Sequence, residues 1–319
     1  MSVLYIGEDD VKQLIDMEES IKLMEQVFSN LGTGTTDNAP RVRVRGDGVM
    51  LHSMSAAADY LGYVGWKAYV TTEKGSQFHV AIYDRNSARM VALIEANYLG
   101  QMRTGATSGV ATESMARPDA AVVGVIGSGL QARTQLKAVC TVRNIQRVEV
   151  YSRREENRKL FAEEMSQWCD TEVIPVHAPD EAASEKDIVI CATTSRVPVF
   201  DGRVLDEGTH LNVIGSNYWH KSEIDDVTIS RADVIVCDSI DQCRQEAGDF
   251  RDALVEGHTD WSLMYELSDV VQGKAIGRKT AESVTLFKSV GLAIEDVAMG
   301  VQLYQWAVED GLGIELPIG

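Results

Sequence analysis

Three positively charged residues in the first third of the chain have the types and surroundings that substrate chemistry needs. Arg41 opens an alternating run with Arg43 and Arg45, so on a strand all three side chains share one face. Lys67 lies among apolar and aromatic residues, where burial would lower its pKa and make it a proton donor. Arg103 stands in a run of small residues, which suggests close approach to a ligand.

Arg45 and Lys67 also have an ordinary structural interpretation. Arg45 is expected on a solvated strand face, and a lysine like Lys67 also reaches solvent by snorkelling. Arg41 follows a proline near the start of its strand, where a guanidinium fork would clamp a carboxylate. The set therefore indicates a site for a small acid that exchanges a proton.

The run Gly127-Ser128-Gly129-Leu130-Gln131-Ala132 follows the apolar stretch 121–126 and predicts a buried strand that turns into a helix. Gly127 permits a tight turn, Gly129 has no Cβ to block a pyrophosphate, and small Ala132 lets helix and strand pack closely. The helix N-terminus then offers backbone N–H groups to the phosphates. This pattern predicts a dinucleotide site.

The residues after the second strand bear on which dinucleotide binds. An NAD enzyme usually presents an acidic residue there to the ribose 2′-hydroxyl, whereas this chain has Ser152-Arg153-Arg154. Two guanidinium groups would pair with a 2′-phosphate, which favours NADP(H). NAD(H) stays possible if Arg153 stacks on adenine and Arg154 faces solvent.

Short apolar strands alternate with helical stretches after the glycine run, as in repeated βαβ units. Strands are predicted at 147–151, 172–176, 187–192, 210–215 and 233–238, and helices at 131–142 and 155–168. Strands that are apolar throughout are usually covered on both faces, as in a parallel sheet. The fold class is therefore α/β, with a Rossmann-type doubly wound parallel sheet domain and a second, α+β domain for substrate binding and dimerisation.

Arg117-Pro118-Asp119 is the predicted boundary between these domains, because proline ends the preceding helix. Residues 1–117 then form the substrate and dimerisation domain, with a helix at 17–31, alternating strands and a hairpin turn near 84–88. Residues 118–291 form the dinucleotide domain. A long amphipathic helix at 289–310 either covers the parallel sheet or, with the chain from about 292 to 319, returns to the first domain.

Composition excludes several classes of protein. The net charge of −18 argues against nucleic acid or anionic lipid as partner, since both require basic surface. No apolar run approaches the ~18 residues of a membrane span, and the first residues do not resemble a secretion signal. The five cysteines form no CxxC pair, which indicates neither a disulfide framework nor a zinc site. A cytoplasmic protein without a metal is expected.

In their order along the chain, these pieces resemble the ornithine cyclodeaminase/mu-crystallin family of NAD(P)-dependent proteins. The matching segments are Arg41, 54–56, 65–67, 102–106, 127–132, 214–216 and 287–291. The resemblance implies a homodimer built through the N-terminal domain, with substrate held between the domains. It implies that Arg41, Lys67 and Arg103 hold the substrate carboxylate and reacting nitrogen, with Arg43 as the alternative to Arg41 in another strand register.

The resemblance also assigns residues to the cofactor. Thr193, Ile214 and Val290 are expected near the nicotinamide, and the wider cofactor set is completed by Thr107, Gly127, Ser128, Gly129, Leu130, Gln131, Ser152, Arg153, Arg154 and Gly215.

Two departures from the cyclodeaminase pattern affect the expected reaction. Asn217 stands where cyclodeaminases carry an aspartate proposed to handle the substrate amine, and an amide is no general base at neutral pH. His52 stands at a position that is acidic in cyclodeaminases. Without these carboxylates a diamine substrate is disfavoured, and a small or acidic side chain fits better.

The leading hypothesis is NAD(P)H-dependent reduction of a small 2-imino acid to an amino acid, or the reverse dehydrogenation. Alanine dehydrogenase-like, ketimine reductase and iminosuccinate reductase activities all fit. The alternatives are ornithine cyclodeamination, which releases ammonia and recycles the cofactor, and a mu-crystallin-like NADPH-binding protein without turnover.

Overall fold

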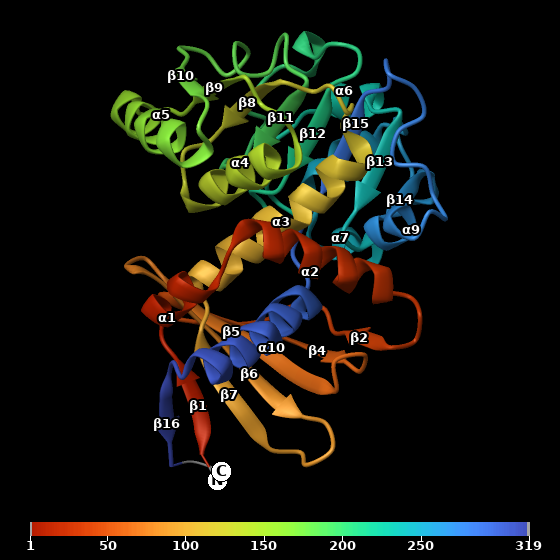
Figure 1. Ribbon diagram of the computed structural model, residues 1–319. Coiled ribbons are helices and arrows are strands. Elements are labelled where there is room, and N and C mark those ends of the chain that lie inside the picture. The colour runs from red at the N-terminus through yellow and green to blue at the C-terminus, as the bar shows by residue number, and fades with distance from the viewer. Residues whose placement is uncertain (1, 318–319) are drawn as a thin grey trace. The chain divides into compact units, whose positions relative to one another are not determined.

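The computed structural model describes residues 2–317, and the chain forms two compact units. One unit contains the chain up to Arg103 together with the chain from Leu292 onward, and the other is Thr104–Gly291. Figure 1 colours both along the sequence, with the blue C-terminal helix among the red and orange elements of the first unit.

The unit Thr104–Gly291 is built on an eight-stranded sheet in which every pairing is parallel, in the order β10-β9-β8-β11-β12-β15-β13-β14. Its strands are β8 (Val122–Ile126), β9 (Arg147–Tyr151), β10 (Glu172–Pro175), β11 (Ile188–Cys191), β12 (His210–Val213), β13 (Val234–Cys237), β14 (Met264–Glu266) and β15 (Thr285–Lys288). All residues of β11, β12, β13 and β15 are buried, as strands covered on both faces must be. The predicted parallel-sheet fold is confirmed.

Helices cover the two faces of this sheet. They are α4 (Leu130–Val142), α5 (Glu155–Cys169), α6 (Asp226–Arg231), α7 (Ile240–Glu246), α8 (Arg251–Val255) and α9 (Leu267–Val271). Two apolar clusters, one around Val125, Leu136 and Phe161 and the other around Leu211, Phe250 and Leu286, form the core.

Helix α3 (Asn97–Met115) is the segment in which the division between the units falls. The division lies at Arg103, whereas the sequence suggested Arg117. The part of α3 beyond Arg103 packs tightly within the second unit: a Cβ on Gly105 would lie 2.4 Å from the Thr134 carbonyl oxygen. The Gln135 side chain donates to the Thr104 carbonyl, and Asn212 donates to Thr112.

The first unit has a mixed sheet in the order β16-β1-β7-β6-β5-β4-β2, with β3 also paired to β4. Its strands are β1 (Val3–Ile6), β2 (Thr36–Asn38), β3 (Val42–Gly46), β4 (Val49–Ala58), β5 (Tyr63–Thr72), β6 (Gly75–Asp84), β7 (Met90–Glu95) and β16 (Ile314–Leu316). The hairpin predicted near 84–88 is confirmed, because β6 and β7 pair antiparallel on either side of it.

Helices α1 (Glu8–Leu14), α2 (Met17–Asn30) and α10 (Ala293–Asp310) belong to this unit, and α10 lies along strands β4 to β7 (Figure 1). Gly300 permits this packing, since a Cβ there would come within 3.0 Å of Val80 and Ile82 side-chain carbons. Helix α10 begins at Ala293 rather than at the predicted Ser289, because residues 289–291 form a loop after β15.

Among the described residues no helix is long and apolar enough to cross a membrane, and no group of acidic, histidine and cysteine side chains is arranged to hold a metal ion. All five cysteines are free thiols, and Cys191, Cys237 and Cys243 are buried.

Candidate active site

A cavity of about 570 Å³ opens at the carboxyl ends of β8, β9 and β11 in the second unit. Its lining includes the glycine run after β8, the residues that follow β9, and Thr193 after β11. Ligands of open parallel sheets bind at this edge, outside the carboxyl ends of the strands.

The glycine run has the geometry that a dinucleotide requires. Gly127 has φ +115°, which favours glycine, and a Cβ there would lie 2.3 Å from the Ala192 carbonyl oxygen. A Cβ on Gly129 would meet nothing within 4 Å, so the space before the N-terminus of α4 is open. Arg133 donates to the carbonyl oxygens of Ser128 and Gly129 and thereby stabilises the turn. The turn fits a pyrophosphate.

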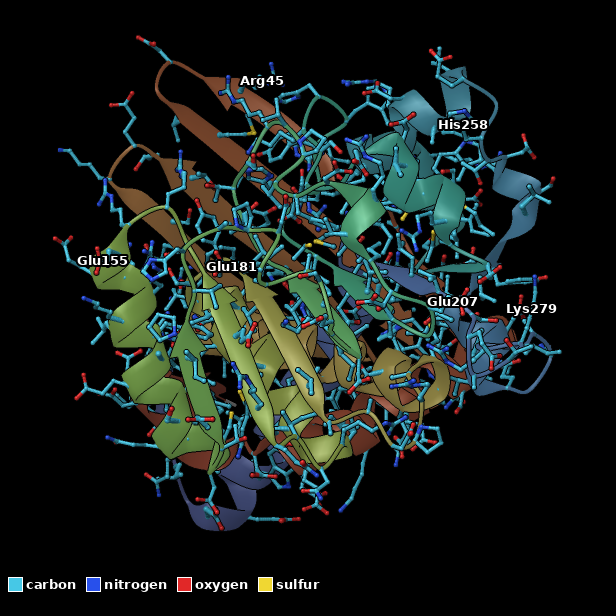
Figure 2. The ribbon with its side chains drawn as sticks, turned by 90° about the horizontal axis from the view of Figure 1, so that it is seen from above. Arg45, Glu155, Glu181, Glu207, His258 and Lys279 are labelled. Atoms are coloured by element: carbon cyan, nitrogen blue, oxygen red, sulfur yellow. The ribbon has the colours of Figure 1, made fainter. Side chains whose placement is uncertain are left out.

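The far side of the cavity is lined by Ser152, Arg153, Arg154 and Asn157. None of the lining residues is a carboxylate, and both arginines are exposed. Figure 2 shows Glu155 at the start of α5, immediately after them, with its side chain directed outward. A ribose phosphate would meet positive charge here.

The other predicted cofactor residues lie in the same unit but outside the cavity lining. Thr107 is buried in α3, Leu130 is exposed and Gln131 half-buried in the first turn of α4. Ile214, Gly215 and Val290 follow β12 and β15. Asn217, which was predicted to bind substrate, is half-buried in the loop after β12. These positions remain predictions.

The first unit gathers a separate, buried cluster of charges. Lys67 on β5 donates to Oδ1 of Asp296 on α10, with Nζ–Oδ1 2.7 Å. Arg103 on α3 donates to the same oxygen from Nε at 3.0 Å and to Glu295 from Nη1 at 2.5 Å. All four side chains are nearly inaccessible to solvent, so these two cations and two carboxylates compensate one another.

This environment shifts the pKa values of Lys67 and Arg103 in opposite directions. Burial lowers the pKa of Lys67 to about 8, and Arg103 and Arg41 add to that effect while Asp296 opposes it. Burial acts to lower the pKa of Arg103, but Asp296 and Glu295 outweigh it and the pKa lies above its usual value. Lys67 can therefore gain or lose a proton at a pH near 8, whereas Arg103 stays charged.

Helix α3, which carries Arg103, is fixed at its start by Glu8. The Glu8 carboxylate accepts from the backbone N–H groups of Asn97 and Tyr98, and the Glu95 carboxylate in turn accepts from the Glu8 N–H. These contacts satisfy N–H groups that a helix start leaves open.

A ladder of side chains extends from Lys67 across the same face of the sheet. Strand register pairs Arg43 with His52, His52 with Tyr69, and Tyr69 with Phe78. The His52 and Tyr69 rings stack with centroids 4.1 Å apart, and Lys67 Nζ lies 5.4 Å from the Phe78 centroid.

His52 is buried, and neither ring nitrogen has a hydrogen-bond partner among residues 2–317. Burial, Arg43 and Arg41 lower the pKa of His52 to about 4, so the ring is neutral at pH 7. Arg41 and Arg43 are half-buried on this side, whereas Arg45 is exposed at the surface (Figure 2).

The structure thus brings Lys67, Arg103, His52, Arg41 and Arg43 to one region of the first unit. Sequence reasoning missed Glu295 and Asp296. Acidic residues in the first turn of a helix are ordinarily explained by the helix dipole. The one available signal was that these two stand beside the apolar residues Ile294, Val297 and Ala298 near the start of an amphipathic helix.

A profile of the Ornithine cyclodeaminase/mu-crystallin family matches residues 5–311. The chain belongs to this family.

Within the family, the chain is 32% identical over 324 residues to a Delta(1)-pyrroline-2-carboxylate reductase of Bacillus cereus, covering 98% of each protein. Thermococcus litoralis Delta(1)-pyrroline-2-carboxylate reductase, solved with NADH and L-proline, matches with a TM-score of 0.95 and 35% identity, over 98% of this chain and 100% of that one. An archaeal alanine dehydrogenase dimer with bound NAD matches with a TM-score of 0.94 and 28% identity over the whole of both chains.

Proposed function

We propose that the protein is an oxidoreductase that uses NAD(P)H to reduce a small 2-imino acid to the amino acid, or catalyses the reverse dehydrogenation. The observation that carries this proposal is Lys67, a buried lysine with a lowered pKa that is paired to Asp296 beside Arg103. The similar proteins named as pyrroline-carboxylate reductase and alanine dehydrogenase act on this class of compound.

The substrate carboxylate would be held by guanidinium groups. Arg103 is charged at every physiological pH, and Arg41 and Arg43 add positive charge that is felt at Lys67 and His52. Because Asp296 and Glu295 balance Lys67 and Arg103, the two further arginines leave an excess of positive charge for one carboxylate.

Lys67 would donate a proton to the imine nitrogen, which makes C2 more electrophilic. Asp296 Oδ1 holds the ammonium group in place, and Oδ2 of the same carboxylate has no hydrogen-bond partner among the described residues, so it would accept from the product amine. A bound reduced nicotinamide supplies the hydride to C2.

The side chain of the substrate would lie against the His52–Tyr69–Phe78 stack. His52 is uncharged at pH 7, so it does not attract a second carboxylate as a cation would. It also lacks the negative charge that would attract a second ammonium group. This favours small apolar or cyclic imino acids, with a dicarboxylate as the second candidate through Arg43.

The dinucleotide would bind by its pyrophosphate at Gly129 and the start of α4. Arg153 and Arg154, with no carboxylate in the lining, favour NADPH on grounds of charge, while the similar reductase and dehydrogenase structures hold NADH and NAD. Both cofactors are therefore to be tested.

The deciding assay follows the absorbance of the reduced nicotinamide with Δ1-pyrroline-2-carboxylate, with pyruvate plus ammonia or methylamine, and with oxaloacetate plus ammonia. Oxidation with at least one of them supports the proposal. Ammonia release from ornithine without net oxidation would instead indicate a cyclodeaminase, and tight cofactor binding without any turnover would indicate a mu-crystallin-like binding protein.

We also propose that two copies of the chain pair through the first unit, as cytoplasmic homodimers. The face of the sheet opposite Lys67 carries an exposed apolar stripe, in which Val44, Leu51 and Val70 are register partners and are 60%, 43% and 38% exposed. A contiguous exposed apolar stripe of this kind is a candidate for a contact between protein chains. The similar alanine dehydrogenase is a dimer, and buried free thiols suit a reducing compartment.

Light scattering tests this pairing. Leu51→Glu should convert the dimer into a monomer, because it places a charge in the stripe. Leu160→Glu, at an exposed leucine of α5, is the matched control and should leave the mass unchanged. A wild-type monomer, or equal behaviour of the two variants, would contradict it.

A further inference from the structure

Two buried carboxylates hold the backbone at the carboxyl edge of the parallel sheet. Glu223 Oε1 accepts from the N–H and hydroxyl of Thr193 at 2.6 and 2.7 Å, and its Oε2 accepts from the Gly215 N–H at 2.6 Å. Glu223 thereby connects the loop after β11 to the loop after β12.

Asp238, directly after β13, holds the loop after β15 by accepting hydrogen bonds from it. Its Oδ2 accepts from the Ser289 hydroxyl at 2.8 Å and from the N–H groups of Val290 and Gly291 at 2.8 and 2.7 Å. Its Oδ1 accepts from the Ser239 N–H. Thr193, Gly215 and Val290 each stand two residues beyond the end of their strand.

The close packing of these loops leaves little freedom. A Cβ on Gly215 would lie 2.3 Å from the Thr193 carbonyl oxygen and 2.5 Å from Glu223 Oε1. Beneath them, Lys288 Nζ forms a fully buried ion pair with Asp249 at 2.7 Å and donates to the Ser216 carbonyl oxygen. Asp249 in turn accepts from the Glu223 N–H at 2.7 Å.

The position of these loops relative to the glycine turn indicates which part of a bound dinucleotide would lie near them. In the sheet order, β9 lies on one side of β8, and β11, β12 and β15 lie in sequence on the other. If the phosphates bind at Gly129 and the adenosine end lies toward Ser152 and Arg153, the nicotinamide end extends over β11, β12 and β15.

We propose that Glu223 and Asp238 are positioning residues for the cofactor, which fix the three loops against which the nicotinamide end of the dinucleotide rests. This inference depends on the proposed function, because it requires that the cavity binds NAD(P)H. Neither carboxylate needs to touch the cofactor, since each acts through backbone N–H groups that it keeps in place.

The test uses amide variants of the full-length protein and measures cofactor binding directly, by the fluorescence of NADH and NADPH. Glu223→Gln offers one acceptor oxygen and places an NH₂ group against a backbone N–H, so it releases Thr193 or Gly215. We expect the cofactor Kd to rise about tenfold or more, roughly 1.4 kcal/mol. Asp238→Asn retains an oxygen for the loop after β15, so a smaller rise of about threefold is expected.

Asp187 provides the matched control at the opposite edge of the same sheet. Its carboxylate accepts from the N–H groups of Ala121 and Val122 and from Arg117, so Asp187→Asn also disturbs a set of donors. Thermal unfolding should shift to a similar degree in Asp187→Asn and Glu223→Gln, whereas the Kd should stay within twofold of wild type in Asp187→Asn alone.

A Kd in Glu223→Gln equal to that of wild type, or an equal rise in Asp187→Asn, would overturn the inference. Should Glu223→Gln fail to fold, Ser289→Ala removes one donor to Asp238 and must still raise the Kd two- to threefold, and no change in that variant would also overturn it. Wild-type protein that binds neither cofactor would instead overturn the proposed function.

Discussion

The two units differ in what the buried carboxylates next to their candidate sites face. In the first unit, Asp296 and Glu295 face the cations Lys67 and Arg103. In the second, Glu223 and Asp238 face backbone N–H groups, and the cavity is lined by glycines and small or polar side chains near the turn.

The two arrangements suit two different functions, proton transfer and the fixing of loop conformation. A lysine paired with a carboxylate retains a proton that it can give to a substrate, and its pKa follows its neighbours. A carboxylate saturated by backbone donors fixes the shape of a loop instead. Substitutions in the first unit should therefore change the rate of the reaction, and those in the second the affinity for the cofactor.

The largest effect is expected for Lys67→Met, which removes the proton donor and keeps the length of the side chain. The kcat for imine reduction should fall about 10³-fold, while the Kd for NAD(P)H stays within twofold. Steady-state kinetics and cofactor fluorescence measure the two quantities. Lys74→Met, at an exposed lysine in the turn after β5, is the control and should behave as wild type. If the cofactor Kd of Lys67→Met rises by as large a factor as kcat falls, the first unit does not act on the rate alone, and the distinction between rate and cofactor affinity is contradicted.

Asp296→Asn should have the next largest effect. It leaves two cations without a shared carboxylate and should lower the free energy of unfolding by about 3–5 kcal/mol.

Wild-type kcat/KM for reduction should fall as the pH rises through about 8, because Lys67 loses its proton there. The kcat/KM for the oxidative direction should rise through the same pH range.

Asp296 raises the pKa of Lys67, so in Asp296→Asn the decline should begin at lower pH. The pH profile of kcat/KM measures this shift, and an unmoved profile would show that Lys67 is not the titrating group.

The smallest effect is expected at the cavity rim. Arg153→Ala removes an exposed guanidinium and should raise the KM for NADPH about tenfold while leaving the KM for NADH within twofold. Steady-state titration with each cofactor measures the ratio, and Arg147→Ala, at the start of β9, serves as the control. Equal changes for both cofactors would mean that Arg153 does not contact a 2′-phosphate.

The fold was largely predictable because its signals are local. The strand 147–151 was predicted with the bounds of β9, and the glycine turn was recognised from six consecutive residues. Strand β15 was missed, since its four residues end in Lys288, and a charge argues against a central strand until its partner Asp249 is known.

The site was less predictable because its partners are distant in sequence. Lys67 was singled out by its apolar neighbours, but Asp296 lies 229 residues away along the chain. Glu223 and Asp238 carry no motif at all, and the role that we propose for them depends on which backbone N–H groups the fold brings to them.

Hydride transfer to C2 of an imino acid, with Lys67 as proton donor, is the step that we propose for this protein. A reaction with reduced nicotinamide cofactor that carries deuterium at both positions of C4, followed by mass spectrometry of the amino acid formed, tests this step. We expect one deuterium at C2 of each product molecule and an equal loss of reduced cofactor, and Lys67→Met should form this product far more slowly. An amino acid without deuterium, or ammonia release from ornithine with no cofactor consumed, would contradict it.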